Sequence, residues 1–259
     1  MSPSDPVSAT PLSRRDFGQQ TLATLLTYSL FETLLRGHAL GAETPAPVAK
    51  WFQDVNSLAQ DMKSQRISQV VWQKKVEELF RQVELPSLLA FLKFDDLTRN
   101  LKYVDNGARS LNFKLPEVDG LPKTLDFGRQ IFAVKKGHAV VPHGHNNMAT
   151  AFLILSGQFQ GRHFDRLEDE PDHILIRPSI DRAFATGETS SISDYKDNIH
   201  WFTATSETAF ILNIHVLDVR PGSEAPTGRV YVNPNGEKLS GGLVRAPRLG
   251  YKQAHDMFG

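Results

Sequence analysis

Apolar residues recur at three- and four-residue spacing over residues 48–100. One apolar stripe predicts an amphipathic helix through Val48, Trp51, Phe52, Val55, Leu58, Ala59 and Met62. The same spacing predicts a second helix through Val76, Leu79, Phe80 and Val83. Pro86 favours a first helical position and predicts a third, short helix over residues 88–94. We expect these helices to be packing elements without a chemical role.

After Gly107 the pattern changes to short apolar runs separated by Gly, Pro, Asn and Asp. The clearest runs are residues 125–134, 151–155, 173–176 and 209–219, which predict an all-β sandwich or barrel. Beyond residue 221, a Gly- and Pro-rich segment predicts one hairpin, with Arg229–Val232 turning at Asn235-Gly236. We therefore expect a helical segment over 43–104, a β-barrel over 105–220, and a C-terminal extension with a hairpin over 221–259.

The first 42 residues resemble a twin-arginine signal peptide. Arg14-Arg15 precede a moderately apolar run over 22–35, and small residues follow at Gly41-Ala42. The apolar run is too short and too polar to form a stable membrane span. This resemblance predicts export, for instance to a periplasm. The alternative is an amphipathic helix with an incidental arginine pair, since Glu32 interrupts the run.

The composition limits both the partners that this protein would bind and the kinds of metal ligand that it can offer. Formal net charge is zero and the pI is about 7.1, so no basic field favours nucleic acid as a partner. The chain has no cysteine, so any metal must use nitrogen and oxygen ligands. Of the nine histidines, six lie from His138 to His200, and that region is the candidate site.

His143 and His145 are separated by one residue, so on a strand both side chains point to the same face. Two imidazoles that converge in a barrel interior cannot both become charged at low cost. As neutral ligands of a divalent metal they can share that space. The pair therefore predicts a metal site.

The spacing around this pair resembles the first motif of the cupin superfamily. Gly137 precedes His143 at the motif's interval, and Gly157 closes the motif, but Thr150 stands where the motif has a glutamate. His200 is similar to the histidine of the second motif, with Asp197 at the position of its usual glycine. The resemblance implies an all-β cupin (jelly-roll) barrel preceded by a short α-helical segment. It also implies a metal on His143, His145 and His200, without a protein carboxylate.

The three-histidine set suits iron(II), because three neutral ligands leave positions for substrate and O2. Zinc, nickel and copper also fit such ligands. The stretches 197–202 and 209–213 resemble those of three-histidine thiol dioxygenases, namely cysteamine dioxygenase and the plant cysteine oxidases. This resemblance covers about residues 105–220 and implies an Fe(II) dioxygenase that acts on a small thiol or another chelating substrate. Where that family has an aspartate near the metal, the nearest residue here is Asn213.

Four further residues are candidates for roles in the site, each with a plainer interpretation. Tyr195 is positioned to donate a hydrogen bond to bound oxygen, or is only a turn residue. Arg129 is positioned to receive a substrate carboxylate, or lies on the surface. Asn213 and His215 share one strand face and would orient a ligand or bind substrate if that face is inward. The alternate face is fully apolar, which favours an outward direction for Asn213 and His215. His163 and His173 stand beside charged residues and are expected to be solvated.

Two functions from different classes follow. The first is the metal-dependent oxygenase, with a small-molecule substrate and O2 as partners. The alternative is a non-catalytic cupin that binds a metal or a small ligand as a sensor or carrier. A metal-dependent isomerase or hydrolase lacks an identifiable general base. Cupins often dimerise, so a homodimer is an expected state of assembly.

Overall fold

The computed structural model describes residues 46–223 and 226–259, so the signal peptide predicted over 1–42 lies outside the described residues. Helices α2 (Ala46–Lys63) and α3 (Gln69–Gln82) match the two predicted from apolar stripes. The third prediction was shifted. The Glu84 side chain caps α4 (Leu85–Phe91) by accepting from the Ser87 N–H, so this helix begins three residues early. Lys93, in a left-handed conformation, then separates α4 from α5 (Phe94–Thr98).

Strands form two antiparallel sheets. The first has the spatial order β1 (Ala108–Leu111), β2 (Gly128–Lys135), β9 (Thr208–Leu217), β4 (Met148–Ser156) and β7 (Thr189–Ile192). The second has the order β10 (Gly228–Val232), β3 (Ala139–Asn146), β8 (Ile199–Ala204), β5 (Gln158–Asp169), β6 (His173–Ala185), β12 (Val244–Leu249) and β11 (Glu237–Lys238).

Strands β2 to β9 follow the order of a jelly roll. With β2 counted as the first strand, one sheet reads 1-8-3-6 and the other 2-7-4-5. This is the double-sheet arrangement of cupins, also called a double-stranded β-helix. The predicted fold class, a cupin-type jelly-roll barrel preceded by a short α-helical segment, is confirmed.

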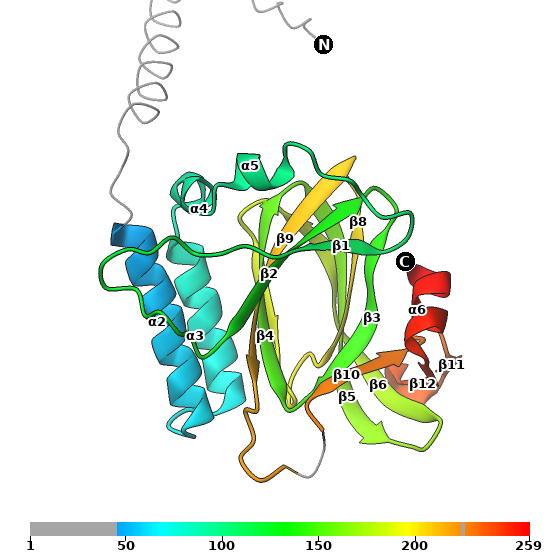
Figure 1. Ribbon diagram of the computed structural model, residues 1–259. Helices are drawn as coiled ribbons and strands as arrows, with labels where there is room; N and C mark the ends of the chain where they lie inside the picture. The colour runs from blue at the N-terminus through cyan, green and yellow to red at the C-terminus, as the bar shows by residue number, and fades with distance from the viewer. Residues whose placement is uncertain (1–45, 224–225) are drawn as a thin grey trace, which may run out of the picture. The chain divides into compact units, whose positions relative to one another are not determined.

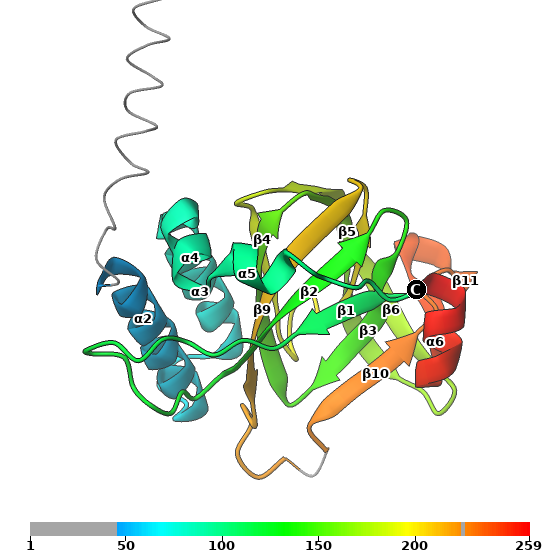
Figure 2. The ribbon, with the colours of Figure 1, turned by 45° about the horizontal axis from the view of Figure 1, so that its top comes forward.

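The helices cover the outer face of the first sheet. Figures 1 and 2 both show α2 and α3 lying against β4 and its neighbours. The helical core residues share one cluster with the outward-facing side chains of β4 and β9, including Leu153, Leu155, Leu212 and Ile214. Both faces of this sheet are therefore buried, one by helices and the other by the opposite sheet.

The aromatic core between the sheets lies at one end of the barrel. Phe152, Phe159, Phe184 and Phe202 belong to a single buried cluster. The Phe152 and Phe202 rings lie 5.2 Å apart in an edge-to-face contact. Phe152 and Phe202 also contact the His200 ring, at 5.0 and 6.2 Å between centroids, so this aromatic core borders the histidines.

The C-terminal extension is part of the second sheet. Strand β10 pairs with β3 and with β12, whereas β11 pairs only with β12. The predicted hairpin at Asn235-Gly236 is not a β10–β11 pair, because both of these strands pair with β12 instead. Helix α6 (Tyr251–Phe258) lies beside β3 and β10, as Figure 1 shows.

Among the helices of the described ranges, none has the length and apolar character required to cross a membrane.

Candidate metal centre

Three buried histidines from two neighbouring strands converge between the sheets. His143 and His145 come from β3 and His200 from β8, and His143 lies directly opposite His200 in the register. Their ring centroids are 4.2 Å apart for His143–His200 and 5.1 Å for each of the other two pairs. One ligand atom from each side chain lies within 4.8 Å of the others, so the group could hold a metal ion.

The hydrogen bonds of the rings leave lone pairs for a metal. His143 Nδ1 lies 2.8 Å from the Val141 carbonyl oxygen, which can only accept, so Nδ1 carries the proton and Nε2 is free. His145 uses Nδ1 toward the Thr150 hydroxyl, and its buried Nε2 has no partner among the described residues. His200 Nδ1 is likewise buried without a partner in the described part of the chain. Buried nitrogens of this kind are costly unless a ligand satisfies them, so the donor set fits a divalent metal.

The electrostatic environment keeps the three imidazoles neutral. Burial, with a smaller contribution from the positive charge of Arg229, lowers the pKa of His143 to about 3. Burial also lowers the pKa of His145 and His200 well below the usual 6.5, and the neighbouring histidines add to the effect. Neutral imidazole is the ligand form, so no proton has to be displaced near pH 7 for a metal to bind.

The backbone of the His-Gly-His segment is held by Asn198. Its Nδ2 donates to the carbonyls of His145 (2.9 Å) and Ser193 (2.8 Å), and its Oδ1 accepts from the His145 N–H at 3.2 Å. A Cβ atom at Gly144 would lie 2.5 Å from Asn198 Oδ1, so glycine is required for this close approach.

Helix α3 supports the loop that carries Asn198. Gln73 accepts from the Ser193 hydroxyl (2.7 Å) and donates to the Ser191 carbonyl (3.0 Å). Since Ser193 in turn accepts from Asn198, a chain of hydrogen bonds runs from α3 to His145. The packing helix thus contributes to the placement of the site, a role that the sequence did not suggest.

Asp197 stands where the second motif usually has a glycine, and its backbone adopts a conformation that glycine favours. Its φ is +54°, in the left-handed region that favours glycine, which is the residue usually found at this motif position. Its backbone N–H donates to the Asp165 carboxylate at 3.0 Å. The chain therefore makes the same turn before His200 with a non-glycine residue.

Thr150 occupies the position of the motif's glutamate and contacts a ligand instead of supplying one. Its Oγ1 lies 3.1 Å from His145 Nδ1, so the hydroxyl orients the ring and directs Nε2 to the site.

Replacing Thr150 with valine is expected to weaken metal affinity about tenfold, because His145 loses the hydrogen bond that fixes its ring. Competition with a chromogenic chelator measures this. Thr189→Val is the matched control, since its hydroxyl donates to the Phe152 carbonyl and contacts no ligand. Equal affinities of Thr150→Val and the unaltered protein would refute the orienting role.

Asn213 and His215 point into the barrel, contrary to the outward direction that the sequence favoured. In the register Asn213 lies opposite Phe152, and His215 opposite Thr150, both of which face the interior. The fully apolar face of β9 is the outer one, covered by the helices. Asn213 Oδ1 is buried without a partner among the described residues, so both side chains are available near the site.

His163 is buried rather than solvated, which corrects the expectation from its charged neighbours. It lies opposite His200 on β5, has no exposed surface, and finds no partner for either ring nitrogen within the described chain. Phe184 and Phe202 pack against it at 6.2 and 5.4 Å. Alternation along β5 turns the neighbours Arg162 and Phe164 to the opposite face. His173 is half-buried on β6.

Arg129 and Tyr195 are not brought to the three histidines. Arg129 lies opposite Ile214, on the outer face, with its guanidinium 5.6 Å from the Phe113 ring centroid. It lines a separate pocket of about 590 Å³ formed with residues 114–125. Tyr195 lies in the loop before β8 with 65% of its surface exposed. Their proposed contacts with substrate and oxygen have no geometric support.

Two residues near the site were missed in the sequence. Arg229 lies opposite His145 and Tyr231 opposite His143, so β10 presents both to the same face as the ligands. The Tyr231 ring centroid is 5.7 Å from that of His143. The alternation of Arg229 and Tyr231 was visible, but no local pattern indicated that this strand would pair with β3.

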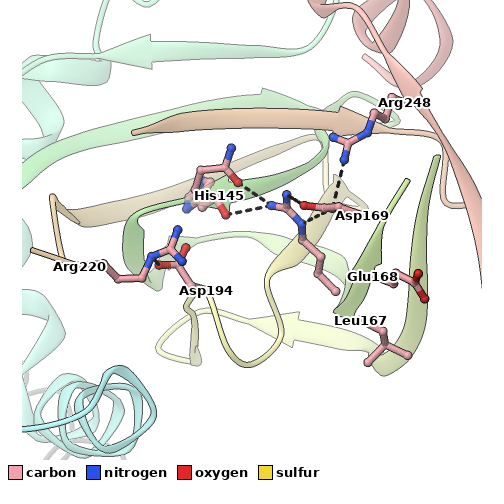
Figure 3. Close-up of a pocket in the computed structure, with 9 residues that line it drawn as sticks. His145, Leu167, Glu168, Asp169, Asp194, Arg220 and Arg248 are labelled. Atoms are coloured by element: carbon pink, nitrogen blue, oxygen red, sulfur yellow. Dashed lines mark hydrogen bonds and ion pairs between the residues drawn. The ribbon is translucent and has the colours of Figure 1, made fainter. Parts of the chain in front are cut away.

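A pocket of about 500 Å³ reaches His145 from the end of the barrel (Figure 3). Ion pairs line it, with Arg220 Nε 3.0 Å from Asp194 and Arg248 3.1 Å from Asp169. The acidic and basic side chains around this pocket largely neutralise one another.

Comparisons with known proteins find structural neighbours only. No family model matches the chain, and no curated protein matches it significantly. An uncharacterized protein with a double-stranded β-helix domain from Klebsiella pneumoniae is 10% identical, with a TM-score of 0.34, over 51% of this chain and 85% of that one. A cupin superfamily protein from Desulfitobacterium hafniense is 16% identical, with a TM-score of 0.30, over 46% of this chain and 84% of that one.

Procruciferin, an 11S globulin from Brassica napus, is 12% identical with a TM-score of 0.30, over 40% of this chain. The match spans only 22% of that globulin. At these identities and TM-scores, the neighbours give no information on the chemistry of this protein. Its fold class follows from the strand order of the two sheets.

Proposed function

We propose that this protein is a metal-dependent oxygenase that uses iron(II) to add O2 to a small thiol or to another chelating substrate. The observation that supports this most is the set of three buried, neutral imidazoles with a threonine at the position of the motif's carboxylate. Three neutral ligands leave the positive charge of the metal uncompensated, and they leave coordination positions open for a substrate.

Iron(II) in this setting would supply redox chemistry with O2 at positions open to the substrate. For a thiol, R–SH and O2 give R–SO2H, so both oxygen atoms enter the product and no external reductant is needed. The chain has no cysteine, so the protein has no thiol of its own that this reaction could oxidise.

The surrounding residues would bind and orient. Thr150 fixes the His145 ring, and Asn198 fixes the backbone of the same residue. Asn213 and His215 face the ligands from the opposite sheet, where an amide and a neutral imidazole can hydrogen-bond to a polar substrate. Burial, with a contribution from Arg229, lowers the pKa of His215, so this ring is neutral at pH 7.

Metal analysis and O2 uptake test the proposal together. Protein purified without oxygen should bind about one iron per chain, and it should consume O2 with at least one substrate from a panel of cysteamine, cysteine, 2-mercaptoethanol and catechol. Iron binding without O2 consumption across the panel would contradict an oxygenase that acts on these substrate classes.

A non-catalytic metal- or ligand-binding cupin is the second candidate, and one observation favours it. His143, His145 and His200 are only 5%, 3% and 1% exposed, which suits a retained metal better than rapid exchange of substrates. Zinc that survives purification, together with no O2 uptake after reloading with iron, would support this function over the first.

A further inference from the structure

The C-terminal extension supplies one wall of the metal centre. Strand β10 adds to the edge of β3 in a register that places Arg229 beside His145 and Tyr231 beside His143. Side chains directly opposite one another on paired strands share a face, so both residues are on the ligand side of the sheet. Helix α6 supports this wall, because the Tyr251 ring packs edge-on against Tyr231 at 5.6 Å.

The Arg229 side chain is exposed and has no hydrogen bond or ion pair with any described side chain. Other arginines near this end of the barrel have carboxylate partners: Arg166 and Arg248 share Asp169, and Arg220 pairs with Asp194. The Arg229 side chain nevertheless lies beside the site, because the register of β10 places it directly opposite the ligand His145.

The charge around the site is one-sided. The three-histidine group contains no carboxylate, and the register of β10 places the Arg229 cation on the same face. A divalent metal on three neutral ligands beside Arg229 would leave a strong excess of positive charge, which only a bound anion can offset.

We propose that the site takes an anion, and that Arg229 receives part of its negative charge while the metal receives the rest. The ligand class is a small molecule with a carboxylate or a similar anionic group next to its metal-binding atom. A guanidinium suits this role because its planar donors match a carboxylate. This inference rests on the metal binding proposed above and adds the charge of the substrate.

Anion binding to the cobalt(II)-loaded protein tests it. Azide and acetate serve as probes, and the visible absorption of cobalt(II) reports their entry into the coordination sphere. We expect Arg229→Gln to bind both anions about tenfold more weakly than the unaltered protein, and Arg229→Lys to lie between them. Arg109→Gln is the matched control, since Arg109 is exposed on the edge strand β1, and it should bind both anions with unaltered affinity.

The affinity for cobalt(II) itself separates a failure of the metal site from a failure of the anion site. Arg229→Gln should bind the metal as tightly as the unaltered protein or more tightly, because a nearby positive charge has been removed. Equal anion affinities in Arg229→Gln and the unaltered protein, with cobalt(II) bound in both, would overturn the anion site alone. Failure of every protein to bind cobalt(II) would overturn the metal proposal and the anion site with it.

Discussion

Replacing His200 with alanine is expected to remove the metal almost completely. Loss of an outer hydrogen bond to a ligand already costs about 10- to 100-fold in affinity, and loss of one of three ligands should cost more. His143 and His145 would remain as two neighbouring residues of one strand, without the donor from β8 that completes the group. Metal content after dialysis against a weak chelator, measured by mass spectrometry, checks this.

The control for this variant is His173→Ala. His173 is half-buried on β6 and is not part of the three-histidine group, so its replacement should leave the metal content unchanged. Circular dichroism should show that both variants fold. A His200→Ala protein that keeps a full complement of metal would show that the ion binds elsewhere.

Acid is expected to unfold the metal-free protein at unusually mild pH. The pKa of His143 and of His163 is lowered to about 3, chiefly by burial. The Arg229 charge adds to the effect at His143, and Arg182 and Lys196 add to it at His163. In the unfolded chain both would titrate near 6.5. The unfolded state therefore binds more protons between these values, and stability falls as pH decreases from about 6.5 toward 3.

The size of this effect is large against the stability of a domain. At pH 4.5 each of the two histidines would lower the free energy of unfolding by about 3 kcal/mol, whereas the total for a domain is only about 5–15 kcal/mol. Burial lowers the pKa of His145 and of His200 as well, so both add to this loss of stability in acid. Thermal unfolding of the metal-free protein at pH 7.0, 5.5 and 4.5 should show a steep loss of stability. His163→Leu removes one such group without touching a ligand and should make the loss shallower. Stability that does not change with pH over this window would contradict the burial of neutral histidines.

Local patterns in the sequence predicted the helices and the metal group. The apolar stripe of α2 depends on neighbours three and four residues apart, and the His143–His145 pair depends on strand alternation, so both are visible without tertiary information. Gly157 was recognised by spacing. It has φ of +78°, and a Cβ atom there would lie 2.4 Å from the Thr208 carbonyl, so the turn requires glycine.

Long-range contacts decided what the sequence could not predict. The direction of Asn213 and His215 depends on helices that bury the outer face of β9, which removes the usual contrast between an apolar inside and a polar outside. The place of Arg229 depends on β10 pairing with β3, about 85 residues earlier in the chain. The sequence left both interpretations of Arg129 open. The structure places this side chain on the outer face, because its β2 neighbour Gly128, which lies against the His215 ring, takes the inward position.

X-ray absorption spectroscopy of the zinc-loaded protein tests the metal centre most directly. With one zinc per chain, the spectrum should require three imidazole nitrogens at about 2.0–2.1 Å and no protein carboxylate. A fit with two imidazoles or fewer, or with a carboxylate ligand, would contradict a site built from His143, His145 and His200.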